Sequence, residues 1–180
     1  SKEMVQESQF LSVATILAET TKEVFEKLVK TTLTFSPPSF KEGKEIKGDV
    51  ASILGITGTR KVSNEEDEGF VDYKAIFVLT WPLEAYIKAS NLMLKEKYTK
   101  YQYEISDVGG EICNVIVGNA KKRLEKEGFT ANLSIPSVIH GSKHRVHYPL
   151  GSTIVAVPLN SSYGDMTLEF GYAEGKKVGP

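Results

Sequence analysis

The sequence contains a single cysteine, Cys113, in its 180 residues. One cysteine excludes a disulfide within the chain and agrees with a reducing compartment. The first ten residues, SKEMVQESQF, lack the apolar core of a secretory signal. Together these features predict a cytoplasmic protein.

Charge of one sign and long hydrophobic runs are also lacking. The 22 basic and 23 acidic residues give a net charge of −1, so we expect neither nucleic acid nor an acidic membrane surface as a partner. No apolar run approaches the roughly 20 residues that a membrane-spanning helix needs. With 41% hydrophobic and 25% charged residues, the composition is that of a globular protein with one buried core.

Three segments have the spacing of amphipathic helices. Apolar residues recur at helical intervals over 10–28, and the SPPSF sequence at 36–40 cannot continue that helix. The segment 82–94 carries a proline in its first turn, where a helix tolerates it. The third helix is predicted over 107–127, with Ser106 or Asp107 as its cap.

The remaining segments alternate like strands. We predict an antiparallel hairpin from 49–58 and 69–80, in which Gly55 and Gly58 suggest a bulge or a turn. In the last predicted strand, 165–172, alternate apolar residues indicate that helices cover one face of the sheet. These residues are Met166, Leu168, Phe170 and Tyr172. Three further strands are predicted over 132–139, 152–159 and 165–172.

This order of elements predicts a mixed α/β (α+β) fold with a mostly antiparallel sheet packed against helices. We expect one domain over 1–180, with its core at about 8–172 and a flexible tail over 173–180.

On a helix of about 100° per residue, the segment 107–127 has one narrow polar stripe. Apolar side chains cover much of the remainder, and Asn119 points away from Glu111 by about 80°. The apolar residues are Ile112, Cys113, Val115, Ile116, Val117, Ala120 and Leu124. The stripe consists of Glu111, Asn114, Gly118, Lys121, Lys122 and Glu125.

Spacing alone favours an ordinary solvated face for this stripe. Glutamate in a first helical turn is stabilised by about 0.3–1 kcal/mol through the helix dipole, and an exposed asparagine costs little. Gly118 is harder to explain, since glycine inside a helix costs about 1 kcal/mol relative to alanine. A flat surface for another backbone would account for it.

Two other clusters have plain interpretations. His140, His144 and His147 have a spacing that metal sites can use, but their segment is rich in glycine and proline and has no carboxylate or cysteine nearby. We interpret it as a basic loop. The acidic residues 65–68 lack the spacing of a calcium loop and predict a solvated hairpin tip. Cys113 is predicted to be a buried side chain that packs in the core, and not a nucleophile.

A longer pattern runs through the third helix and the strand after it. The helix has the form D-x-x-x-E-x-x-N-x-x-x-G, and the later segment has the form S-x-P-x-x-x-x-G. This pattern resembles the CheX branch of the CheC/CheX/FliY family of chemotaxis phosphatases, over about residues 8–172. The residues that carry the resemblance are Asp107, Glu111, Asn114, Gly118, Ser134, Pro136 and Gly141.

The resemblance implies a CheC-like fold and a phosphatase that acts on the aspartyl phosphate of a CheY-type response regulator. Asn114 would orient the attacking water, and Glu111 would pair with a lysine of the regulator. Gly118 would permit close approach of the partner, with Lys121 and Lys122 also docking it. The family further implies a homodimer joined at sheet edges and no cofactor of its own, since the Mg²⁺ belongs to the regulator.

Some alternatives stay open. Glu111 as a general base is disfavoured because the anionic phosphoryl group would repel it. The first helix contains no second E-x-x-N, which favours a CheX-like chain with one site over a CheC-like chain with two. The fold could also serve as a non-catalytic scaffold for a regulator, as a flagellar-switch-like module, or as a structural domain unrelated to phosphate chemistry. The connections 63–69 and 141–151 look long for the family.

Overall fold

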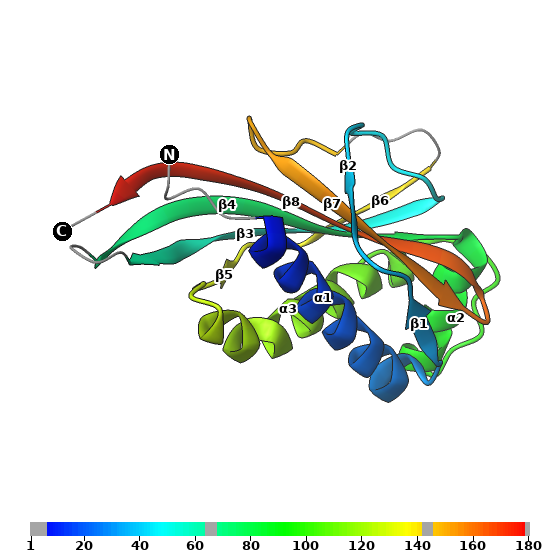
Figure 1. Ribbon diagram of the computed structural model, residues 1–180. Coiled ribbons are helices and arrows are strands. Elements are labelled where there is room, and N and C mark those ends of the chain that lie inside the picture. Colours follow the sequence, from blue (N-terminus) through cyan, green and yellow to red (C-terminus); the bar gives the residue numbers. More distant parts are fainter. Residues whose placement is uncertain (1–6, 64–67, 142–145, 179–180) are drawn as a thin grey trace.

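The computed structural model describes residues 7–63, 68–141 and 146–178. An antiparallel sheet forms one layer and the helices form a second layer against one of its faces (Figure 1). In the described residues, no helix is long and apolar enough to cross a membrane. The helical elements are α1 (Glu7–Val24), the π-helical turn η1 (Phe25–Val29), α2 (Leu83–Leu94), the 3₁₀ turn η2 (Tyr103–Ile105) and α3 (Val108–Lys126).

The eight described strands form one sheet in the order β1-β7-β8-β4-β3-β5, with β2 also paired to β7 and β6 to β3. All neighbouring strands are antiparallel, which confirms the predicted mixed α/β class. The strands are β1 (Leu33–Phe35), β2 (Ser39–Lys41), β3 (Val50–Ser63), β4 (Glu68–Trp81), β5 (Asn132–Leu133), β6 (Ser137–His140), β7 (Thr153–Ser161) and β8 (Gly164–Val178).

The predicted hairpin is confirmed as β3 and β4, and each strand has 14 residues. The predicted bulge or turn at Gly55 and Gly58 is wrong, because the pairing of β3 with β4 continues through both glycines without a shift. Gly58 has another role. A Cβ there would lie 2.1 Å from the carbonyl oxygen of Thr130, so the glycine lets the chain after α3 lie against β3. The predicted acidic tip at 65–68 lies mostly outside the described residues, which resume at Glu68.

Two predicted strand boundaries are also wrong. The segment 132–139 is not one strand: β5 and β6 are separated by Ser134–Pro136, and proline cannot donate a ladder hydrogen bond. The expected flexible tail is instead the end of β8, which extends to Val178 because it pairs with β4 as far as Phe70. The last two residues of that expected tail lie outside the described residues.

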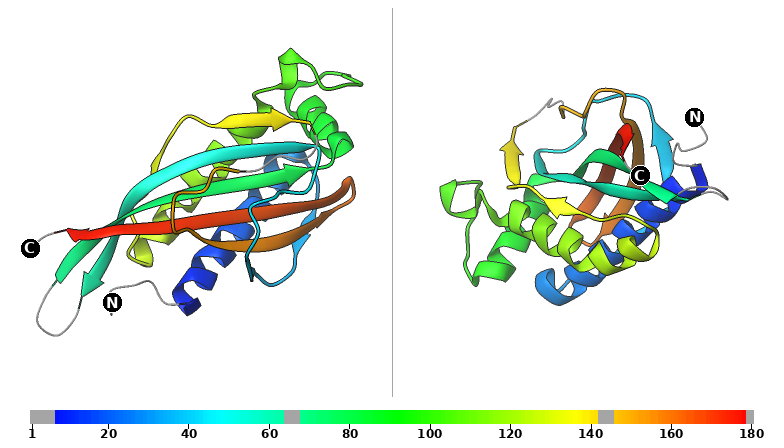
Figure 2. Two further views of the ribbon diagram at one scale, coloured as in Figure 1. Left: turned by 90° about the horizontal axis from the view of Figure 1, so that it is seen from above. Right: turned by 90° about the vertical axis from the view of Figure 1, so that its left-hand side faces the viewer.

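The main core lies between the sheet and the helices. Figure 2 shows α1 and α3 under the same face of the sheet, and α1 and α3 also pack against each other. The alternate residues of β8 that were predicted to face helices are all buried in this core, which confirms the prediction. Its largest fully buried side chains include Trp81, Tyr86, Phe25 and Phe77.

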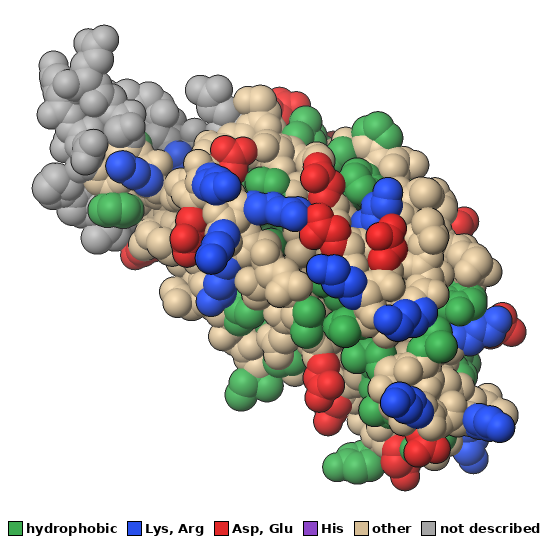
Figure 3. Space-filling model, turned by 90° about the horizontal axis from the view of Figure 1, so that it is seen from below, with side chains coloured by type: hydrophobic (Ala, Val, Ile, Leu, Met, Phe, Trp, Pro, Cys, Tyr) green, Lys and Arg blue, Asp and Glu red, His purple; other side chains and the backbone are tan. Residues whose placement is uncertain are grey.

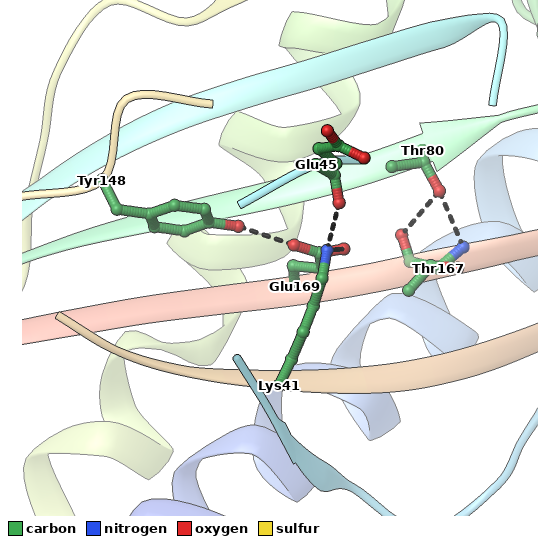
Figure 4. A network of polar contacts seen from close by, with 6 residues as sticks. All are labelled: Lys41, Glu45, Thr80, Tyr148, Thr167 and Glu169. Atoms are coloured by element: carbon green, nitrogen blue, oxygen red, sulfur yellow. Dashed lines mark hydrogen bonds and ion pairs between the residues drawn. The ribbon is translucent and has the colours of Figure 1, made fainter. Parts of the chain in front are cut away.

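The opposite face of the sheet is covered in part by chain segments without helices. A smaller apolar cluster there is formed by Ile46, Ala51, Val78, Val146, Tyr148 and Ile154. Beside it, the buried Glu169 accepts hydrogen bonds from the Lys41 ammonium at 2.6 Å and from the Tyr148 hydroxyl at 2.8 Å (Figure 4). Burial and the neighbouring Glu169 raise the pKa of Tyr148, which keeps its hydroxyl a donor. These hydrogen bonds connect two segments, the one that bears Lys41 and the one that bears Tyr148, to β8.

Candidate functional site

A tyrosine of α2 fixes the start of α3. The Tyr86 hydroxyl accepts a hydrogen bond from the N–H of Gly109 at 3.0 Å and donates one to the carbonyl of Ile105 at 2.7 Å. Asp107 lies at the cap position, as predicted, but its side chain makes no capping bond, and the Ser106 hydroxyl bonds to the turn before the helix. Tyr86 therefore supplies from another helix the hydrogen bond that a local cap would have made.

Two glycines bring this first turn against the sheet. A Cβ on Gly109 would lie 2.1 Å from the Ser52 hydroxyl oxygen, and a Cβ on Gly110 would lie 3.1 Å from the ring of Pro136. Both glycines are buried, and Glu111 follows them directly at an exposed position. The start of α3 is thus held by α2, by β3 and by the segment before β6.

The predicted polar stripe of α3 exists, and we call it the polar strip. Glu111, Gly118 and Lys122 are exposed, whereas Asn114 and Lys121 are half-buried. The opposite side is buried, as predicted, except for Val115, which is 36% exposed at the border of the strip. The ion pairs of the described residues join Lys41 to Glu169, Arg60 to Glu174 and Arg123 to Glu23, and none of them includes Glu111.

A hollow of 240 Å³ lies beside Glu111. The first turn of α3 forms one wall, which includes Asp107 and Glu111, and the segment 135–138 forms the other. The second wall is mostly apolar and includes Ile135, which is 92% exposed. We call this space the acidic hollow. The spacing of neither segment predicts this hollow, although it brings together the two halves of the long pattern.

The surface around the helices has no dominant charge. Figure 3 shows acidic and basic side chains interspersed over this side of the molecule. A larger hollow of 760 Å³ is lined by strand residues that include Thr57 and Lys74, and by Leu150. That hollow includes no residue of the polar strip.

The histidines lie apart where they are described. His140 stacks on Tyr101 with 4.0 Å between ring centres, and His147 lines the larger hollow. His144 lies outside the described residues. Among the residues that the structure describes, no three histidine, cysteine, aspartate or glutamate side chains are grouped to hold a metal.

Cys113 is fully buried, as predicted. Burial raises the pKa of its thiol well above the usual range, only partly offset by a hydrogen bond with Ser52. The thiol therefore stays protonated at neutral pH and is a poor nucleophile.

The fixation of α3 by Tyr86 can be tested with Tyr86→Phe. We expect the free energy of unfolding to fall by about 1–3 kcal/mol, because the N–H of Gly109 stays buried without a partner. Amide hydrogen exchange at Gly109 and its neighbours in the first turn should also become faster.

Tyr73→Phe is the matched control, since Tyr73 is also a buried tyrosine whose hydroxyl bonds to a carbonyl, that of Thr130. This variant should lose stability without faster exchange at the start of α3. Equal exchange in that turn for both variants would show that Tyr86 does not hold it.

Comparisons with known proteins agree with this architecture. The family model described as chemotaxis phosphatase CheX matches residues 71–160, half of the chain. The crystal structure of a chemotaxis protein CheX from Desulfovibrio desulfuricans is 25% identical, with a TM-score of 0.75 over 88% of this chain and 97% of that one. A search of curated proteins found no match.

Two further structures share the fold. A CheC-like superfamily protein from a Shewanella species is 22% identical, with a TM-score of 0.73 over 89% of this chain and 97% of that one. A chain of the CheX–CheY–BeF₃–Mg²⁺ complex from Borrelia burgdorferi is 17% identical, with a TM-score of 0.67 over 92% of this chain and 99% of that one. The fold is thus that of CheX and CheC-like proteins, and with the family match over half of its length the chain belongs to the CheX family of chemotaxis phosphatases.

Proposed function

We propose that this chain is a cytoplasmic phosphatase that hydrolyses the aspartyl phosphate of a CheY-type response regulator in chemotaxis signalling. One observation carries the proposal: a member of the CheX family presents Glu111 and Asn114 on one exposed strip, with Glu111 at the end of a tightly held first turn and Asn114 three residues later. The complex of Borrelia burgdorferi, which contains CheX, CheY, BeF₃ and Mg²⁺, supports a regulator of this type as the partner.

Asn114 holds the attacking water in this proposal. An aspartyl phosphate is already an activated acyl phosphate, so its hydrolysis mainly needs a water placed in line with the leaving oxygen. The asparagine amide has a carbonyl and an NH₂ group, which together orient a water without adding charge. Because Asn114 is half-buried on its helix, its amide has less freedom than a fully exposed side chain.

Glu111 pairs with a lysine of the regulator and fixes the register of the two proteins. It lies one turn before Asn114 and lines the acidic hollow. Such a pair contributes most when docking removes both charges from water in good geometry. The Mg²⁺ comes with the regulator in this mechanism, and the chain needs no cofactor of its own.

Gly118 and the two lysines after it extend the docking surface along the polar strip. A Cβ on Gly118 would meet no atom within 4 Å, so the chain itself gives no reason for a glycine there. Close approach of the regulator is the reason that we propose. Lys121 and Lys122 lie further along the same strip and would contact the regulator at the edge of the interface.

Gly118→Ala separates stability from docking. The alanine should raise the free energy of unfolding by about 1 kcal/mol, because it favours the helix and meets no neighbour. It should at the same time weaken binding of the regulator. Asn119→Ala is the control, an exposed change on the same helix that should leave binding unaltered. Wild-type affinity in Gly118→Ala would remove this role for the glycine.

We also propose a homodimer joined at sheet edges. The pairing of β7 with β8 ends at Tyr172, whereas β8 itself continues to Val178. The other edge of β8 therefore has no strand beside it over 173–178, within the part of the chain that is described. A free edge can accept a strand of a second copy. Sedimentation equilibrium at micromolar concentration would find a dimer, and a monomer would contradict this arrangement.

The phosphatase is tested by phosphorylating a CheY-type regulator with a small-molecule phosphodonor, removing the donor and following loss of phosphate with Mg²⁺ present. The rate of loss should rise in proportion to the amount of chain added, at amounts well below that of the regulator. A non-catalytic scaffold would bind the regulator activated with BeF₃ and leave this rate unchanged.

A further inference from the structure

Ile135 is held in an exposed position by both of its neighbours. Ser134 donates two hydrogen bonds to the carbonyl of Gly55, from its N–H and from its hydroxyl, each at 2.9 Å. Pro136 lies directly against Gly110 of α3. Ile135, between these two fixed points, is 92% exposed. Its exposure follows from the break between β5 and β6 and not from a lack of local contacts.

The acidic hollow beside Ile135 has two unlike walls. Asp107 and Glu111 supply two carboxylates, whereas Pro136 and Val138 supply apolar surface. A lysine side chain combines an apolar stem with a charged end, and such side chains bury the stem along apolar surface. The volume of 240 Å³ is below the roughly 300–1,000 Å³ of typical small-molecule pockets, which favours one inserted side chain over a separate ligand.

We propose that Ile135 is a hydrophobic contact for the CheY-type regulator, placed beside the regulator lysine that enters the acidic hollow. This inference rests on the proposed function, because it adds residues to the same interface. The stem of the lysine lies along Pro136 and Val138, its ammonium lies near Glu111 and Asp107, and Ile135 packs against the apolar surface next to that lysine. Charge complementarity at the hollow selects the regulator as the occupant. Ile135 then helps to decide which regulators bind.

The test compares Ile135→Ser with Leu150→Ser. Leu150 is 97% exposed but lies at the larger hollow, away from the polar strip, so it controls for the loss of an exposed apolar side chain. With a CheY-type regulator activated by BeF₃ and Mg²⁺, Ile135→Ser should raise the Kd about tenfold, which corresponds to ~1.4 kcal/mol. Leu150→Ser should bind like wild type, and Ile135→Leu should regain most of the affinity.

The rate of phosphate loss at saturating regulator should not change in Ile135→Ser, because this residue does not touch the reacting atoms. A Kd within twofold of wild type would overturn the inference, and the phosphatase proposal would stand if the wild-type chain still accelerates phosphate loss. If Ile135→Ser changed the sedimentation mass but left regulator binding unchanged, Ile135 would instead be a contact for a second copy of this chain. If the wild-type chain neither binds the regulator nor accelerates the loss, both proposals fail.

Discussion

Replacing Glu111 by alanine should weaken binding of the BeF₃-activated regulator by about 2–5 kcal/mol, roughly thirtyfold to several thousandfold in Kd. The loss is large because the regulator's lysine would be left in a desolvated interface without its partner. Titration calorimetry of the variant and the wild type measures it. The chain itself should stay folded, because removing a first-turn glutamate costs the helix only about 0.3–1 kcal/mol.

Glu125→Ala is the matched control for this experiment. Glu125 is an exposed glutamate on the same helix, near its other end and outside the acidic hollow. Its removal should change the affinity little, as expected for a charge at the rim of an interface. Unaltered affinity in Glu111→Ala, measured on folded protein, would exclude the proposed pairing with the regulator's lysine.

Asn114→Ala should slow the catalysed loss of phosphate about 100-fold or more at saturating regulator, because misplacing a reacting group by about 1 Å already has an effect of that size. Binding of the BeF₃-activated regulator should change far less, since the amide contacts the water and not the lysine. The variant should also be somewhat more stable, by up to about 0.7 kcal/mol, because alanine is the better helix former. Loss of activity could then not be assigned to unfolding.

Asn119→Ala is the control for the amide. Both asparagines lie on α3, but Asn119 points away from Glu111 and is not part of the polar strip. This variant should hydrolyse the phosphate like wild type. If Asn114→Ala did so as well, the water would be positioned by another group.

The polar strip of α3 was predictable because helical periodicity is a local property of the sequence. Six of the seven residues predicted for the apolar side are buried, and Glu111 and Gly118 are exposed as predicted. Val115 is the exception because it borders the strip, where a small rotation of the helix decides whether a side chain meets the core or water. The pairing of β3 with β4 was predictable for the same reason, since alternation is also local.

Contacts between distant segments were not predictable from these patterns. The acidic hollow joins Glu111 to Pro136, and nothing in the spacing of either segment shows that they meet. The start of α3 is held by Tyr86 from another helix, although Ser106 and Asp107 offered ordinary capping chemistry. Both features depend on tertiary contacts, and at the start of α3 such a contact replaced the local cap that the sequence favoured.

Predictions from local patterns were also wrong for Gly58 and for the end of the chain. Gly58 looked like a bulge in its strand, but its lack of a side chain serves the close approach of Thr130. The residues after Tyr172 are polar and glycine-containing, which is typical of a tail. They form the end of β8 because backbone pairing with β4 does not depend on apolar side chains.

Multiple turnovers by one chain distinguish an enzyme from a binding module most directly. The measurement follows phosphate released from a phosphorylated CheY-type regulator in large excess over the chain, with Mg²⁺ present and no phosphodonor. We predict that each wild-type chain hydrolyses many phosphorylated regulators in succession. The total rate of phosphate release should be well above that of the regulator alone. Phosphate release at the rate of the regulator alone, in the presence of a chain that binds it, would contradict the assignment as a phosphatase.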